Sequence, residues 1–268
     1  MYTLGQKSAR KIVNLTHFRI MRFERFDLLN KTGLIELLNR WVSRETPIEL
    51  QEFVIRNYQR SNAQLQQDLW ALNHFMLNHN SDGVGGYFVE FGATDGVNLS
   101  NTYLLEKSFG WKGILCEPAQ SFHQQLEENR TSIIDKRCVY SRSDSLIEFH
   151  EVKNRELSGI KDFHGIGGWK DEREDFISYP VKTVSLQDLL KSNGCPKVIN
   201  YMSIDTEGSE FEIIKDFPFH EWNIECLSIE HNYSQNDFAI EELLAEKGFK
   251  RVCKSASRWD GWYIGRQI

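Results

Sequence analysis

Acidic residues and glycines are concentrated in one short stretch, YFVEFGATDG, which covers residues 87–96. The stretch is typical of a strand that ends in a tight turn, and such a turn presents backbone N–H groups to a ligand. A pyrophosphate-binding turn follows the pattern G-x-G-x-x-G, whereas this one contains only Gly92 and Gly96. Glu90 and Asp95 would also repel a diphosphate at close range, so the turn is predicted to hold a cation.

S-adenosylmethionine has the required charge, because it contains a sulfonium and an α-ammonium group. Glu117 ends the next β-rich run, GILCEP, about 20 residues after Gly96, where an acid reaches the ribose hydroxyls of a bound nucleoside. Glu117 alone suits NAD equally well, but together with Glu90 it favours the methyl donor. Asp95 has a simpler explanation as a helix cap.

A second group of polar residues follows two later β-rich runs. Its members are Asp205, Glu207, Glu210, Glu230 and His231. The carboxyl ends of neighbouring parallel strands face one cleft, so these side chains are expected to converge. The simpler alternative for the glutamates is stabilisation of a helix N-terminus.

Short β-rich runs alternate with helical ones from residue 87 onward, which predicts a βαβ fold with a parallel sheet. The final runs FKRVCKS and WDGWYIG predict an antiparallel hairpin, with Trp259, Trp262 and Tyr263 in the core at the sheet edge. Residues 151–179 between these patterns are expected to be irregular. They include HGIGGW, interpreted as an acceptor loop in which Trp169 stacks on a sugar, or as a plain solvent loop.

The first eighty residues have a different, helical texture. Thr46 is expected to cap a helix that starts at Pro47, and a second amphipathic helix runs from Leu65 to Met76. SDGVGG then interrupts the helical pattern. We therefore divide the chain into a helical region, 1–80, and an α/β domain, 81–268.

Charge and cysteine usage restrict the class of protein. The net charge is −6 over 268 residues, which argues against nucleic acid as a partner. Residues 1–31 are basic, and they are interpreted as a solvated leader or as a peripheral contact with an anionic membrane. The five cysteines are scattered and suggest buried thiols of the cytoplasm rather than zinc or disulfide sites.

Six motifs together resemble the FkbM family of S-adenosylmethionine-dependent methyltransferases. They are FVEFGATDGVNLSNT, GWKGILCEP, VKTVSLQDLL, YMSIDTEGSEFEII, LSIEHN and WDGWYI. The resemblance covers roughly residues 65–263. It implies a class I methyltransferase (Rossmann-like) fold, which is a seven-stranded, mostly parallel sheet whose last strand is antiparallel. It also implies methyl transfer to oxygen, typically on a sugar or another hydroxylated metabolite.

The resemblance also implies positions for the cofactor. Glu90, Gly92 and Asp95 would hold its methionine end, with Asp205 nearby, and Glu117 would hold the ribose. The end of the third strand, at Tyr140 and Ser141, would lie beside the adenine. Ser158 is a further candidate for cofactor or acceptor contact.

Two routes for removing the acceptor proton remain open at this stage. In one, His231 or Asp205 is the base with Glu207 close by, and Glu230 would favour the charged form of His231. In the other, Asp205, Glu230 and Asn232 bind Mg²⁺, which lowers the pKa of the acceptor hydroxyl.

Two other functions also remain open. One is an NAD-linked sugar oxidoreductase or epimerase, and the other is a non-catalytic adaptor built on a methyltransferase scaffold. The favoured hypothesis is a methyltransferase with a small-molecule or glycan acceptor, and an oligomer is compatible with it.

Overall fold

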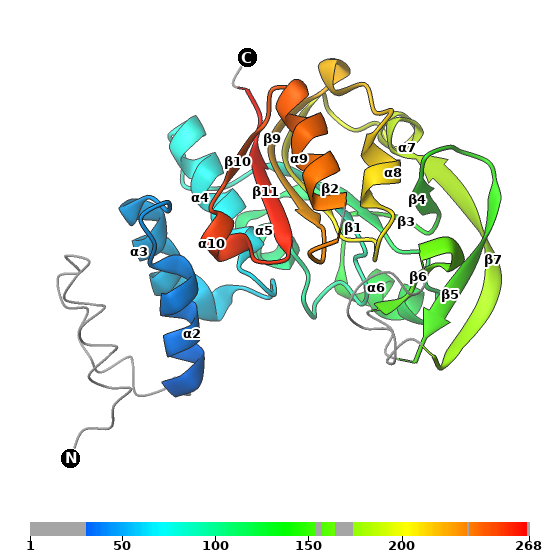
Figure 1. Cartoon of the computed structure of the whole chain (residues 1–268), viewed down its shortest axis with the longest axis horizontal. Helices are drawn as coiled ribbons and strands as arrows, with labels where there is room; N and C mark the ends of the chain where they lie inside the picture. The colour runs from blue at the N-terminus through cyan, green and yellow to red at the C-terminus, as the bar shows by residue number, and fades with distance from the viewer. Residues whose placement is uncertain (1–30, 154–156, 164–173, 235, 267–268) are drawn as a thin grey trace.

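The computed structural model describes residues 31–153, 157–163, 174–234 and 236–266. Figure 1 shows a large sheet with helices packed around it and a smaller sheet at the end of the molecule opposite α2 and α3. The basic residues 1–30 and the HGIGGW segment lie outside the described residues.

Seven strands form the large sheet, in the order β10-β11-β9-β8-β1-β2-β3. Their bounds are Lys250–Val252 (β10), Asp260–Ile264 (β11), Asn223–Glu230 (β9), Val198–Ile204 (β8), Tyr87–Phe91 (β1), Lys112–Cys116 (β2) and Ile133–Asp135 (β3). β11 is antiparallel to both β9 and β10, and every other pairing in this sheet is parallel. The sheet is therefore mixed, with the expected seven strands and the expected antiparallel hairpin at one edge.

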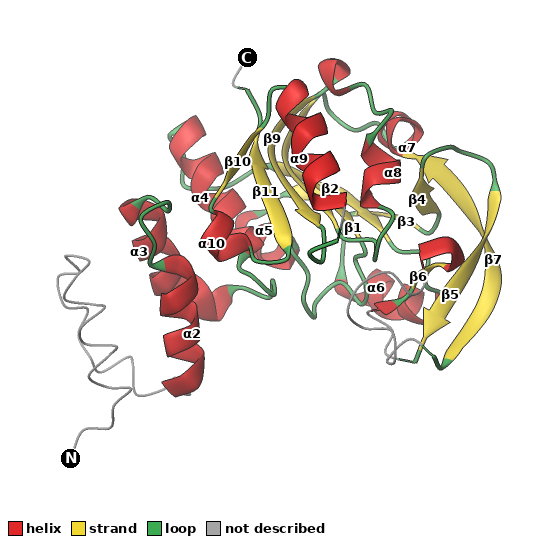
Figure 2. Cartoon of the chain, viewed as in Figure 1, coloured by secondary structure: helices red, strands yellow, loops and turns green. Residues whose placement is uncertain are grey.

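Helices cover both faces of this sheet, as Figure 2 shows. One face packs against α2 (Lys31–Trp41), α3 (Ile48–Asn57), α4 (Gln67–His79), α5 (Tyr103–Phe109), α6 (His123–Asn129) and α10 (Lys254–Ser257). The other face packs against α7 (Leu186–Ser192), α8 (Glu210–Ile214) and α9 (Asn236–Glu246). Short 3-10 helices cover Tyr58–Arg60, Gln120–Phe122, Lys161–Phe163 and Phe219–Glu221. Side chains alternate across a strand, so the neighbours Phe88 and Val89 belong to different cores.

A second sheet of four strands takes in both ends of the segment expected to be irregular, at residues 151–152 and 176–179, and also residues 159–160 within it. The prediction was wrong for these residues. The order of this sheet is β4 (Cys138–Tyr140), β7 (Phe176–Ser185), β5 (Leu146–Val152) and β6 (Gly159–Ile160). A small core that includes Phe149, Ile160 and Val181 supports it, while Leu146 and Ile177 are exposed. Both faces of these strands contain apolar residues, so the sequence lacks the strict alternation of apolar and polar residues that predicts a strand.

The N-terminal helices share a core with the large sheet. The Trp70 ring stacks on that of Trp262 at 5.0 Å, and the Trp41 ring lies 5.5 Å from it. Trp262 and Tyr263 are buried, as expected for the sheet edge. The two predicted helices are present as α3 and α4.

The predicted cap of α3 was wrong. Pro47 occupies the N-cap position, and no side chain caps the helix there. The Thr46 hydroxyl lies 3.1 Å from Ser43 Oγ instead, and the Thr46 carbonyl accepts a hydrogen bond from Gln51 Nε2. Gln51 thus ties the preceding turn to the helix.

The state of the cysteines and the character of the helices can be compared with the composition. All five cysteines are free thiols, and each of them except the half-buried Cys195 is buried. Over the described ranges, no helix combines the length and the apolar character needed to cross a membrane.

Candidate functional site

A cavity of about 700 Å³ lies where the parallel strands of the large sheet end. Ligands of open α/β sheets collect at this edge. Residues at or just after the ends of β1, β2, β8 and β9 line the cavity. Those that the sequence singled out are Glu90, Gly92, Glu117, Asp205, Glu207, Glu230 and Asn232.

The turn after β1 requires glycine. Gly92 has φ +73°, and a Cβ atom there would lie 2.1 Å from the carbonyl oxygen of Asp205. Its N–H donates a hydrogen bond of 3.0 Å to the carbonyl oxygen of Cys116 on β2. Gly92 therefore brings the ends of β1, β2 and β8 together at the floor of the cavity.

Glu90 is buried on β1 with a full set of partners. Its carboxylate accepts hydrogen bonds from the Ser100 hydroxyl, the Asn101 N–H and the Thr102 hydroxyl. It also lies 3.7 Å from a guanidinium nitrogen of the buried Arg130. Burial raises the pKa of Glu90, and Arg130 opposes that rise. Glu90 thus fixes the turn before α5 as well as lining the cavity.

Asp95 is not among the described residues that line the cavity. Its Oδ1 accepts hydrogen bonds from the backbone N–H groups of Val97 and Asn98, at 2.9 and 2.8 Å. These bonds close the turn at residues 95–98, whereas α5 begins only at Tyr103. Thr94 and Asn98, on either side of Asp95, line the cavity in its place.

Glu117 lies at the end of β2 and is buried. Its two oxygens accept hydrogen bonds of 2.8 Å from the N–H groups of Thr94 and Ala119. Burial raises the pKa of Glu117 to about 7, although the two hydrogen bonds lower it. Each oxygen retains a lone pair with which to accept a further donor.

Tyr140 and Ser141 do not belong to the described lining of the cavity. The chain leaves the large sheet at Asp135, whose carboxylate pairs with Arg137 at 2.6 Å, and β4 then joins the second sheet. Cys138, two residues before Tyr140, lines the cavity instead. Because the chain passes from the large sheet to the second sheet between Asp135 and Cys138, Cys138 rather than Tyr140 lines the cavity.

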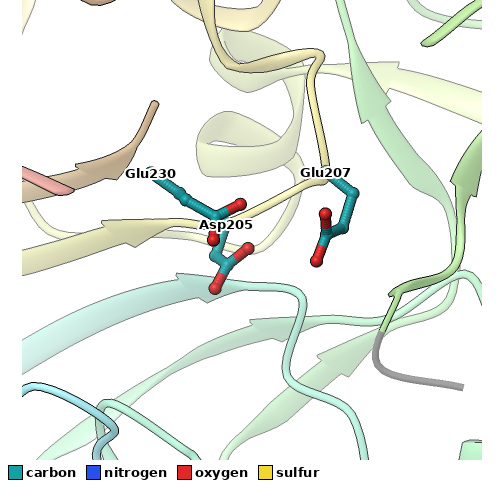
Figure 3. Close-up of side chains that lie close together, drawn as sticks. All are labelled: Asp205, Glu207 and Glu230. Carbon is teal, nitrogen blue, oxygen red and sulfur yellow. The ribbon is translucent and has the colours of Figure 1, made fainter. Parts of the chain in front are cut away.

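Three carboxylates converge at the ends of β8 and β9, as Figure 3 shows. Asp205, Glu207 and Glu230 each place one oxygen within 4.8 Å of the other two. We call this group the acid triad. Burial, reinforced by the neighbouring acids, raises the pKa values of Asp205 and Glu230 well above their ordinary range. The triad can therefore hold a proton, or a cation that offsets its charge.

Glu230 is the most enclosed member of the acid triad. The residue is 9% exposed, and its Oε2 has no hydrogen-bond partner within the described chain. Glu210, the fourth acid of this region, does not line the cavity. It accepts hydrogen bonds of 3.0 Å from the N–H groups of Thr206 and Gly208, and so supports the loop after β8.

His231 is not among the described residues that line the cavity, and the expected increase in its basicity was wrong. Burial lowers the pKa of His231. The charge of Asp237 acts in the opposite direction but does not offset this effect. Nδ1 accepts a hydrogen bond of 3.1 Å from the Tyr233 N–H, and Nε2 lies 3.0 Å from Arg251 Nη2. Arg251 comes from β10, a contact that no local sequence pattern reveals.

Several lining residues were missed from the sequence. They are Gln64, Gln67, Leu99, Leu157, Ile160, Tyr233 and Trp259. Gln64 reaches the cavity because Ala63 forms a parallel bridge with Leu99, a pairing between distant segments. Trp259 packs against the core as a half-buried residue, and it also lines the cavity. Ser158 also lines the cavity, and its hydroxyl accepts a hydrogen bond from the Val152 N–H.

The charged side chains that line the cavity are all acidic among the described residues. They are the carboxylates of Glu90, Glu117 and the acid triad. In their ionised form these carboxylates attract a cationic ligand and repel phosphate groups, and a bound cation favours that form.

Three comparisons relate the chain to known proteins. Among solved structures, a chain of a fibrillarin/Nop5p complex has 14% sequence identity and a TM-score of 0.33, over 73% of this chain and 80% of that one. The search of curated proteins gave no match. Residues 90–251 match the family described as the methyltransferase FkbM domain. Because this match covers more than half of the chain, the protein belongs to the FkbM methyltransferase family.

Proposed function

We propose that the protein is an S-adenosylmethionine-dependent O-methyltransferase of the class I fold that methylates a hydroxyl of a carbohydrate. The main support is the acid-lined cavity at the ends of β1, β2, β8 and β9. Its carboxylates complement the sulfonium and ammonium groups of the cofactor, whereas the pyrophosphate of NAD would be repelled. The same charge argument disfavours the oxidoreductase alternative.

The residues that remain in the cavity suit this cofactor. We assign its methionine end to the Glu90–Gly92 turn with Thr94 and Asn98, and its ribose to Glu117. Glu117 can accept a ribose hydroxyl because each of its oxygens makes only one hydrogen bond to the backbone. Pro118 and Cys138, rather than Tyr140 and Ser141, are proposed to lie beside the adenine.

Proton removal is assigned to the acid triad. The bound cofactor supplies a methyl group already activated by positive sulfur, so the protein must align the acceptor oxygen and remove its proton. A carboxylate with a raised pKa is a stronger base than an ordinary one, which favours Asp205 or Glu230 as the proton acceptor. Glu207 lies close enough to share the proton.

A Mg²⁺ ion is the alternative route for the same residues. Three oxygens within 4.8 Å of one another, one of them from Glu230, suit a hard cation, and Asn232 lines the same cavity. We favour the direct route because the triad needs no additional group to accept a proton. Methyl transfer that survives EDTA supports it, and loss with EDTA that Mg²⁺ restores would replace it with the metal route.

Calorimetry and methyl transfer test the proposal separately. S-adenosylhomocysteine is expected to bind both the wild type and Asp205→Asn. Transfer of labelled methyl from S-adenosylmethionine to a panel of methyl glycosides should fall at least about 100-fold in Asp205→Asn. Absence of binding to the wild type would exclude the cofactor. Transfer to amines instead of glycosides would exclude the acceptor class.

The cellular setting is proposed on the sequence alone. We place the reaction in the cytoplasm, with a glycan or small-molecule acceptor and without nucleic acid. Contact of the basic residues 1–31 with an anionic membrane surface, and an oligomeric state, are kept as further hypotheses.

A further inference from the structure

Two aromatic side chains line the cavity on the side of the acid triad. Tyr233 follows β9 and is 71% exposed, and Trp259 precedes β11 and is half-buried. Large aromatic side chains are costly to leave in water, and a folded chain usually buries most of their surface. The exposure of Tyr233 beside a cavity, with Trp259 lining the same cavity, therefore points to a ligand.

The backbone holds these two residues together. The N–H groups of His231 and Asn232 both donate hydrogen bonds to the carbonyl oxygen of Trp259, at 2.8 and 3.1 Å. The guanidinium of Arg258 lies 5.7 Å from the Trp259 ring centroid and pairs with Glu36 of α2. The aromatic pair is thus presented on a fixed frame rather than on a free loop.

The Tyr233 backbone is strained. Asn232 and Tyr233 have consecutive positive φ angles of +47° and +53°. Asparagine tolerates this conformation, but a bulky aromatic residue rarely adopts it. Strain of this kind persists where the surrounding structure enforces it, and it is concentrated at functional sites.

Gln64 and Leu99 line the same cavity from another part of the chain. Both are exposed, and the bridge between Ala63 and Leu99 holds their segments side by side. Gln64 offers an amide that both donates and accepts hydrogen bonds, as sugar hydroxyls require. Gln64 and Trp259 both lie outside residues 90–251, the part of the chain that matches the FkbM domain.

We propose that Tyr233, Trp259 and Gln64 form a subsite that binds a neutral sugar ring of the acceptor. The aromatic faces would cover the apolar face of the ring, and the Gln64 amide would contact its hydroxyls. Described lining residues provide no cationic side chain, so the subsite favours a neutral sugar over a glycosyl phosphate. This inference rests on the proposed function, because it takes the acceptor to be a carbohydrate.

Saturation-transfer NMR with methyl hexopyranosides tests the subsite, in the presence of S-adenosylhomocysteine. Wild-type protein should transfer saturation to the ring protons of at least one glycoside. Tyr233→Ala and Trp259→Ala should each weaken binding of that glycoside about tenfold. Tyr233→Phe and Trp259→Phe keep a ring and should keep most of the binding. Phe238→Ala, which removes a 76% exposed aromatic on α9 outside the cavity lining, should change nothing.

Calorimetry with S-adenosylhomocysteine tests the cofactor assignment separately from the sugar subsite. All these variants should bind it as the wild type does, because the substituted residues lie away from the Glu90–Gly92 turn and Glu117. If S-adenosylhomocysteine binds but no glycoside does, the subsite is wrong and the cofactor assignment stands. The same holds if the alanine variants bind glycosides as tightly as the wild type. Tighter binding of a glycosyl phosphate than of the neutral glycoside would also overturn the subsite.

Discussion

Gly92 and Asp205 approach so closely that a Cβ atom on Gly92 would lie 2.1 Å from the Asp205 carbonyl oxygen. The contact joins the ends of β1 and β8, which provide the two halves of the cavity. Asp205 belongs to the acid triad, and Gly92 to the turn assigned to the methionine end of the cofactor. The position of the proposed base relative to the cofactor thus depends on this contact between two backbones.

Gly92→Ala should therefore destabilise the protein and disable the site. The positive φ costs roughly 1–2 kcal/mol for any residue with a Cβ, and the clash with a backbone atom adds to it. Gly194→Ala is the matched control, because Gly194 has φ +63° with nothing within 4 Å of its Cβ position. Thermal melting and calorimetry with S-adenosylhomocysteine compare the two. Equal effects of both substitutions would mean that the contact with Asp205 does not matter.

The acid triad predicts a stability that falls as pH rises. Burial and the neighbouring Asp205 raise the pKa of Glu230 in the folded state above its ordinary value of 4.5, so the folded chain binds more protons than the unfolded chain. The favourable contribution is complete below pH 4.5 and is lost as pH rises through the folded-state pKa. Glu230→Gln should remove part of this dependence. At pH 8 it should raise the melting temperature by about 2–4 °C, the shift expected for roughly 1 kcal/mol.

The same substitution should impair methyl transfer while it stabilises the fold. Glu128→Gln removes an exposed carboxylate from α6 and serves as the control for net charge. It should leave both the pH dependence of melting and the transfer rate unchanged. A Glu230→Gln protein that is less stable than the wild type at pH 8 would show that Glu230 is ionised and compensated by a bound cation.

His231 is predicted to position Tyr233 rather than to accept the proton. The Tyr233 N–H donates to Nδ1 of His231, and the two rings meet edge to face at 5.6 Å. His231→Gln should therefore raise KM for the acceptor several-fold and leave kcat and its pH profile nearly unchanged. Loss of a general base would instead lower kcat by about 10²–10⁴-fold. Steady-state kinetics over a range of pH separates these outcomes.

The sequence predicted the large sheet well because strands and helices alternate with clear local periodicity. The acids at the ends of β1, β2, β8 and β9 were found for the same reason, since position along a strand determines position in the cleft. To predict the positions of Glu90, Glu117 and Asp205, only the order of the strands had to be known. Their placement together followed from topology rather than from any contact between side chains.

Predictions failed where distant contacts decide the outcome. His231 does not line the cavity, and its Nε2 lies beside Arg251 from β10 instead. Tyr140 leaves the cavity because β4 pairs with β7, more than forty residues later. Gln64 enters it through a bridge to Leu99. None of these pairings has a local sequence signal, so a single sequence does not reveal them.

Tyr233 offers the last test, because stability and binding should respond to its substitution in opposite directions. Its φ of +53° is unfavourable for tyrosine but not for glycine, and its ring is mostly exposed, so little packing is lost with it. Tyr233→Gly should thus keep or raise the free energy of unfolding, by up to about 1 kcal/mol, while KM for the acceptor increases. Urea unfolding and acceptor kinetics on the same preparation measure both. A clear loss of stability would mean that Tyr233 supports the fold and that its strained backbone serves packing instead of the acceptor.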